Sequence, residues 1–370
     1  MRPAFSSIRQ AAAFALLLLI LLLSPVFAGK RFLPPRAEAY SSLTWRFGDF
    51  GFLYQQIFQQ KGDIDIAFIG SSRMWAGIDT PYVEQELSKR LGRPAVVRTL
   101  AWNWLGCDAD FFITQDLLQN RKVHMIVIDD EFRADEPPHV AATHWFRLGD
   151  NAAALRGLPP RIQSSFFFAA ILGMPRNLLS LVRPNLPEIL ASTDIEHWRE
   201  AFHAPNPCER AGSLSVKRWE YADAPFSAYA PHGNALPSDI IVYSPATSDQ
   251  FKFSGLGATS WQHQFVKKLA ILAQENNVKL VFLHLTPVYS DNETNNLVIQ
   301  ERECWPLVLN TNLSLIGIPP EKLYSGIAAA DLPKLFYTPD FYHFNQNGQK
   351  FFTPLITPTL FHIYETEATH

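Results

Sequence analysis

The feature that most constrains the fold is an apolar run that ends abruptly at a glycine. The residues from Ile66 to Ile69 are all apolar, and Gly70, Ser71, Ser72 and Arg73 follow them. Such a run is typical of a central strand in a parallel sheet, and open α/β sheets place ligands and nucleophiles at the turn after such a strand. The stretch predicts a buried strand that delivers a serine to a sharp turn. A Gly-Ser turn without chemistry is the alternative interpretation.

Helical and strand patterns alternate around this turn. The expected elements are a strand over 64–69, a helix capped by Thr80 and stopped at Gly92, a strand over 96–100, a helix capped by Asp108 and running to Leu118, and a strand over 123–129. This βαβαβ order predicts an α/β fold with a doubly wound, flavodoxin-like parallel sheet of about five strands.

The alternation is interrupted between about residues 133 and 259. This stretch contains many prolines, scattered aromatic residues and only short helical patterns such as 164–172. We expect a large irregular insertion, whose aromatic side chains either form a local core, line a substrate groove or face a membrane. The alternation resumes with an amphipathic helix and a strong strand over 278–285. We therefore expect one interrupted α/β domain over 62–370.

The first thirty residues carry a targeting signal. Two arginines precede a continuous apolar run over 11–23. Small residues before position 29 fit cleavage of a signal peptide after Ala28, which would release a secreted protein. The run also approaches the ~20 residues that a membrane span needs, and the two basic residues directly after it suit an uncleaved anchor. We favour a membrane anchor with an extracytoplasmic domain, joined to it by a connector over 31–61.

Composition argues against several classes of function. The formal net charge is −3 and no basic stripe is present, so we expect no nucleic-acid partner. The three cysteines lie far apart without Cys-x-x-Cys spacing, which predicts neither a disulfide framework nor a zinc site. Walker and Gly-x-Gly-x-x-Gly patterns are absent at Gly70, so we expect no nucleotide there, and the chemistry below needs neither a metal nor an organic cofactor.

A second chemical motif lies near the C-terminus, where Asp340 and His343 are three positions apart. On one helical turn this spacing would place a carboxylate beside an imidazole. The carboxylate would then orient the ring and stabilise the imidazolium that forms when the histidine takes a proton from a serine. Another histidine, His284, lies inside a predicted strand, and we expect it to be a core residue with satisfied hydrogen bonds.

Together, the Gly-Ser-Ser turn, a glycine after the second strand and the Asp-x-x-His motif resemble the SGNH (GDSL-like) hydrolase superfamily. The resemblance covers about residues 62–132 and 260–362. It implies that Ser72 is the nucleophile, with Ser71 in place of the family's usual aspartate. It further implies that Gly106 contributes to the oxyanion hole, and that Asp340 and His343 form the acid–base pair.

The third block departs from the family pattern. The family usually shows Gly-x-Asn-Asp after the third strand, with the asparagine donating to the oxyanion, whereas this chain has Asp129, Asp130 and Glu131 there. A carboxylate cannot donate unless it is protonated. Losing one oxyanion donor typically costs ~10²–10³ in rate, which slows an enzyme without abolishing its activity.

Two alternatives follow from this departure. Either the oxyanion rests on the backbone N–H groups of Ser72 and Gly106, with help from Asn103 or Arg73, or hydrolysis is impaired. Arg73 and Asp130 are also candidate substrate-binding residues at the active edge of the sheet, although a capping or salt-bridge role is an alternative for Asp130.

The Gly-Ser-Ser form, the altered third block and the N-terminal segment resemble membrane-tethered members of the superfamily, such as the D-alanine transfer proteins of teichoic-acid assembly and the acetyltransferases of exopolysaccharide export. The resemblance implies a serine esterase or O-acyltransferase that acts on an ester-linked acyl group of an envelope glycan or lipid through an acyl-enzyme, with a membrane acyltransferase as a candidate partner. The alternative is a catalytically impaired scaffold or glycan-binding protein of an envelope assembly system.

Overall fold

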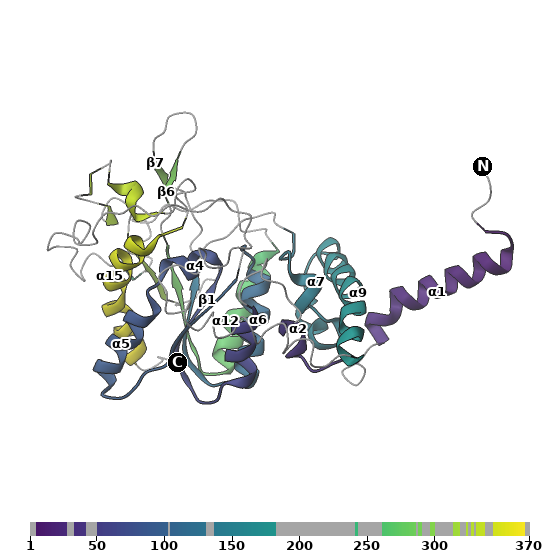
Figure 1. Cartoon of the computed structure of the whole chain (residues 1–370), viewed down its shortest axis with the longest axis horizontal. Helices are drawn as coiled ribbons and strands as arrows, with labels where there is room; N and C mark the ends of the chain where they lie inside the picture. Colours follow the sequence, from purple (N-terminus) through teal and green to yellow (C-terminus); the bar gives the residue numbers. More distant parts are fainter. Residues whose placement is uncertain are drawn as a thin grey trace. The chain divides into compact units, whose positions relative to one another are not determined.

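The computed structural model describes residues 5–27, 33–41, 50–102, 104–130, 137–182, 241–242, 261–285, 288–290, 297–299, 314–318, 323–324, 327–328, 331–336 and 343–366 (Figure 1). The chain divides into two compact units. One comprises Met1–Leu43 and Pro137–Ser192, and the other comprises Thr44–Glu136 and Thr193–His370.

A parallel sheet forms the centre of the second unit. Its strands are, in spatial order, β2 (Val97–Ala101), β1 (Ile64–Gly70), β3 (Val123–Asp129), β5 (Lys279–Leu283) and β8 (Ser314–Gly317). All four neighbouring pairs among these five strands are parallel, which confirms the doubly wound, flavodoxin-like α/β fold. A short strand, β4 (Ile241–Val242), pairs antiparallel with β8 at the edge and was not expected, because it lies inside the predicted insertion.

Helices cover both faces of this sheet (Figure 1). One face carries α5 (Thr80–Leu91) and α15 (Gln346–Glu365), and the other carries α6 (Cys107–Asn120) and α12 (Gln262–Glu275). The second unit also contains α3 (Phe50–Tyr54), the π-helix η2 (Gln55–Gln59), α4 (Ser72–Gly77), η7 (Leu332–Leu335) and the antiparallel pair β6 (Val288–Ser290) and β7 (Leu297–Ile299). Since both faces are covered, every residue of β1 is buried.

The core has an aliphatic and aromatic layer on each side of the sheet. On the side of α15, Phe344 and Phe352 stack with ring centroids 5.4 Å apart. On the opposite side, Phe265 of α12 lies 5.6 Å from Phe111 and 5.4 Å from Phe112 of α6. This packing explains why α12 appears where the amphipathic pattern predicted a helix.

Two predicted helix caps were wrong by one or two residues. Helix α5 is capped by Asp79, whose carboxylate accepts a hydrogen bond from the Tyr82 N–H at 3.2 Å. Thr80 is not the cap, because its hydroxyl is buried against Thr99 at 2.6 Å. Helix α6 begins after Gly106 rather than after Asp108. The predicted stop at Gly92 is confirmed, since its φ of 64° is the left-handed conformation that glycine favours.

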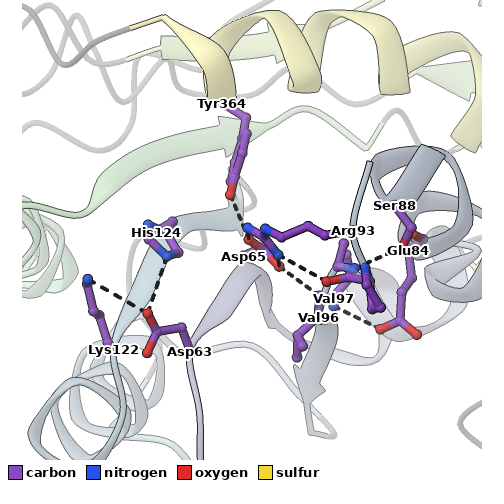
Figure 2. Close-up of polar contacts among 12 residues, drawn as sticks. Asp63, Asp65, Glu84, Ser88, Arg93, Val96, Val97, Lys122, His124 and Tyr364 are labelled. Carbon is purple, nitrogen blue, oxygen red and sulfur yellow. Dashed lines mark hydrogen bonds and ion pairs between the residues drawn. The ribbon is translucent and has the colours of Figure 1, made fainter. Parts of the chain in front are cut away.

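The amino edge of the sheet is tied together by polar contacts (Figure 2). Asp65, near the start of β1, accepts hydrogen bonds from Arg93 at 2.6 Å and from the Tyr364 hydroxyl at 2.7 Å. The backbone N–H of Val96 donates to the same carboxylate at 2.8 Å. Burial would raise the pKa of Asp65, but these hydrogen bonds together lower it below its usual value.

The other unit is helical where it is described. It contains α1 (Ile8–Phe27), α2 (Glu38–Ser41), α7 (Ala142–Trp145), α8 (Leu148–Asn151), η3 (Ala152–Leu155) and α9 (Pro160–Val182). The 23 residues of α9 correct the expectation of only short helical pieces in the insertion, since the helix continues through Pro175. Arg147 donates to the carbonyl of Pro34 at 2.6 Å, so the insertion and the N-terminal segment belong to one unit.

Helix α1 is apolar over most of its length and leaves many large side chains exposed, with Leu17 at 65% and Ile20 at 57%. None of the helices in the described part of the chain combines the length and apolar character that crossing a membrane requires.

Candidate active site

The structure brings Ser72 and His343 together, although they are 271 positions apart in the sequence. The Ser72 Oγ lies 2.8 Å from the His343 Nε2. Ser72 is the first residue of α4, directly after β1. This distance is within the range in which a histidine can take the proton of a nucleophilic hydroxyl.

The turn after β1 gives its two serines different environments. The Ser71 side chain is buried and caps α4, since its Oγ accepts a hydrogen bond from the Arg73 N–H at 3.2 Å. The Ser72 side chain is half-buried and reaches His343 instead. Gly70 fits tightly in front of them, because a Cβ there would lie 3.3 Å from the Cβ of Met74. The local sequence therefore leaves one hydroxyl available for chemistry.

The backbone just after His343 is held in place by Asn345, the residue that caps α15. The side-chain oxygen of Asn345 accepts hydrogen bonds from the N–H groups of Asn347 and Gly348, at 2.8 and 3.2 Å. Its amide donates to the carbonyls of Lys334 and Phe336, both at 2.9 Å. Because the Asn345 side chain both donates and accepts hydrogen bonds, the backbone two residues after His343 has a fixed position.

The Asn-x-x-Gly spacing has a steric reason as well. A Cβ at Gly348 would lie 2.3 Å from the carbonyl oxygen of Leu335. Only glycine allows the first turn of α15 to approach the backbone so closely.

The helices that follow the two residues are docked on each other. The Gln349 side chain of α15 donates to the carbonyl of Trp75 in α4 at 3.3 Å. The N–H of Asp79, just after α4, donates to the Thr353 hydroxyl of α15 at 2.9 Å. The separation of Ser72 and His343 is therefore set by helix–helix contacts as well as by the two turns.

The turn after β2 approaches the same edge of the sheet. The Trp102 N–H donates to the Gly70 carbonyl at 3.1 Å, which ties this turn to the end of β1. Gly106 ends the turn and precedes α6. Trp104 is 43% exposed and adopts a φ of 67°, a conformation that non-glycine residues rarely adopt. Asn103, a predicted oxyanion donor, lies outside the described residues.

Asp130 is fully buried and contacts His284. Its carboxylate oxygen lies 2.6 Å from the His284 Nδ1, and its N–H donates to the Leu283 carbonyl at 3.1 Å. Of the roles considered for Asp130, this geometry supports a structural contact inside the protein rather than contact with substrate. The pairing was missed, although the carboxyl ends of β3 and β5 meet at one edge and both residues follow those strands.

Arg73 is buried too, with 2% of its side chain exposed. Its Nη1 lies 3.3 Å from the Asp129 carboxylate, and its Nη2 donates to the carbonyl of Leu285. The guanidinium is thus directed into the protein, which does not support the expected contact with substrate.

A further carboxyl group at this edge carries an unusual proton affinity. Burial raises the pKa of Asp110 well above its usual range, and the carboxylates of Asp129 and Asp108 raise it further. Asp110 lies in the first turn of α6, beside the turn that carries Gly106.

Asp340, the predicted orienting carboxylate, lies outside the described residues. Among the residues that are described, no cluster of three or more His, Cys, Asp and Glu side chains could hold a metal ion.

The sequence matches no model of a known protein family, and a search of curated proteins finds no significant match.

Proposed function

We propose that the protein is an SGNH-type serine esterase or O-acyltransferase. The observation that carries this proposal is the 2.8 Å contact between the Ser72 Oγ and the His343 Nε2. It lies at the carboxyl edge of a doubly wound sheet, where open α/β folds place their active sites. Ser72 at a tight strand–helix turn and His343 before the last helix also follow the order that the superfamily resemblance implies.

The reaction proceeds in two half-reactions. His343 removes the Ser72 proton as the Oγ attacks the carbonyl carbon of an ester, and Asp340 orients the imidazole. Collapse of the tetrahedral intermediate breaks the ester bond, and His343 returns the proton to the leaving alcohol. Water or a sugar hydroxyl then attacks the acyl-enzyme, with the same histidine as base, and regenerates Ser72.

The oxyanion is stabilised by backbone N–H groups, those of Ser72 and Gly106. The link between the Trp102 N–H and the Gly70 carbonyl supports this assignment, because it holds the two turns at one edge. Asp130 is not the donor, since its carboxyl group is buried against His284.

The substrate is an ester-linked acyl group of a cell-envelope glycan or lipid. This part of the proposal rests on the N-terminal segment, whose basic start and apolar run are typical of a signal peptide or a membrane anchor. We propose an extracytoplasmic location, anchored if the segment is retained and secreted if it is cleaved. A membrane acyltransferase that supplies the acyl group would be the partner in a transfer reaction.

A catalytically impaired scaffold or glycan-binding protein is the second candidate. It is favoured by the altered third block. There the Asp130 carboxylate contacts His284, and the block contains no asparagine that could donate to an oxyanion.

A fluorophosphonate probe separates the two candidates. The purified full chain should become covalently labelled between pH 6 and 9, and Ser72→Ala should abolish the labelling. Ser71→Ala is the matched control, because it removes the neighbouring hydroxyl, which caps α4, and should leave Ser72 as the labelled residue. Absence of labelling throughout this pH range would favour the scaffold.

A further inference from the structure

The residue directly after the proposed nucleophile joins three strands of the sheet. Arg73 follows Ser72 at the end of β1, its guanidinium contacts Asp129 at the end of β3, and it donates to the Leu285 carbonyl beyond the end of β5. Only 2% of the Arg73 side chain and 3% of the Asp129 side chain are exposed. The contact is therefore an internal ion pair at the active edge.

Stability alone does not account for such a pair. Removing two charges from water costs about as much as their mutual attraction returns, so apolar residues of similar volume often serve equally well. The pair instead fixes the relative positions of the chain segments that it joins. A guanidinium presents several donors in a rigid plane, and here it serves a carboxylate and a carbonyl from different strands at once.

The nucleophile lies between two fixed points. On one side, the Arg73 backbone N–H donates to the Ser71 side chain, and the Arg73 side chain contacts Asp129 of β3 and the Leu285 carbonyl just after β5. On the other side, α4 is held by Gln349 of α15, the helix that begins just after His343. A shift of the strand–helix turn would move the Ser72 Oγ away from the His343 Nε2, and a misplacement of about 1 Å can cost 10²-fold in rate.

We propose that Arg73 is a positioning residue, which holds the Ser72 Oγ against His343 through its contacts with Asp129 and the Leu285 carbonyl. This inference rests on the proposed function. It assigns to Arg73 no contact with substrate, and it gives Asp129, which directly precedes Asp130, the task of anchoring the nucleophile turn.

The test uses variants that separate position from stability. Removing Arg73 alone would leave a buried carboxylate unpaired, so Arg73→Met is combined with Asp129→Asn, which removes both charges together. We expect the full-length double variant to react with a fluorophosphonate about 10²-fold more slowly than wild type, with an unchanged final fraction of labelled protein. Arg73→Lys keeps the charge but not the two-armed geometry, and it should give an intermediate rate.

The matched control is the pair at the opposite edge, Arg93→Met with Asp65→Asn. This pair also ties down an end of β1, but it lies at the strand's start and should leave the labelling rate constant near that of wild type. If the Arg73 double variant does not fold, the rate constant of Arg73→Lys decides.

The outcomes are distinguishable. A wild-type chain that is not labelled at Ser72 would defeat the proposed function, and this inference with it. A labelled wild type with Arg73 variants that react at the wild-type rate would defeat the inference alone. A smaller labelled fraction with an unchanged rate constant would also overturn it, because that is the signature of a purely structural role.

Discussion

Ser71 and Ser72 are neighbours with opposite roles, and the difference follows from where each hydroxyl finds its partner. Ser71 satisfies a backbone N–H at the start of α4, whereas Ser72 faces a histidine from the far end of the chain. The sequence suggested Ser72 through a family resemblance, but only the fold shows that the Ser71 hydroxyl is already engaged. The burial of Arg73 was unpredictable for the same reason, since its partners come from β3 and from the residues just after β5.

At the same scale, Asp110 should destabilise the fold at neutral pH. Burial raises the pKa of Asp110 above its unfolded value, so the folded state favours the protonated carboxyl group. The stabilisation by the protonated form is complete below about pH 4 and is lost as the pH rises through the folded pKa. Asp110→Asn should therefore stabilise the protein more at pH 7 than at pH 4. Urea unfolding at both pH values checks this, with the exposed Asp63→Asn as control. An equal effect at both pH values would contradict it.

At the scale of elements, α4 and α15 form the structural support of the site. Each begins at or just after one of the two reacting residues, and Gln349 and Thr353 of α15 bond to the backbone of Trp75 and Asp79.

The α/β order, four of the five parallel strands and most of the helices around them were predictable, because their apolar patterns are strong and local. Strand β8 was missed, since four residues carry little periodicity. Helix α15 was not assigned, because its internal Pro354 and Pro358 disguise the pattern.

The start of α15 should be the most sensitive point of this support. In Gly348→Ala the new methyl group would lie 2.3 Å from the Leu335 carbonyl oxygen, so the helix must shift. We expect a loss of at least about 1–3 kcal/mol of stability, the usual cost of overpacking, together with slower labelling of Ser72. Thermal unfolding and labelling rates measure both. Gly92→Ala is a useful contrast, because no atom lies within 4 Å of a Cβ there and its cost should come from backbone strain alone, without a change in labelling rate.

At the scale of the whole sheet unit, the amino edge is closed by the C-terminal end of α15 (Figure 2). Burial, followed by the hydrogen bond to Asp65, raises the pKa of Tyr364 to about 12. The raised value means that the stabilisation by this phenol is complete below its ordinary pKa of about 10 and is lost between roughly pH 10 and 12. The lowered pKa of Asp65 has the opposite sign, so its contribution is present above about pH 4 and is lost as the pH falls further.

Tyr364→Phe should therefore remove part of the alkaline loss of stability and weaken the fold slightly at neutral pH, by about 1 kcal/mol for one hydrogen bond. Denaturant unfolding between pH 7 and 11.5 measures this. Identical pH profiles of the variant and the wild type would show that the phenol does not titrate with the fold.

The central claim is that His343 activates Ser72 as a nucleophile. The most direct test is to locate the fluorophosphonate adduct by peptide mass spectrometry and to measure its rate of formation in wild type and in His343→Gln. The account predicts one adduct, on Ser72, and a rate that falls by about 10²–10⁴ in the variant, the usual contribution of a general base. An adduct on another residue, or an undiminished rate without His343, would contradict it.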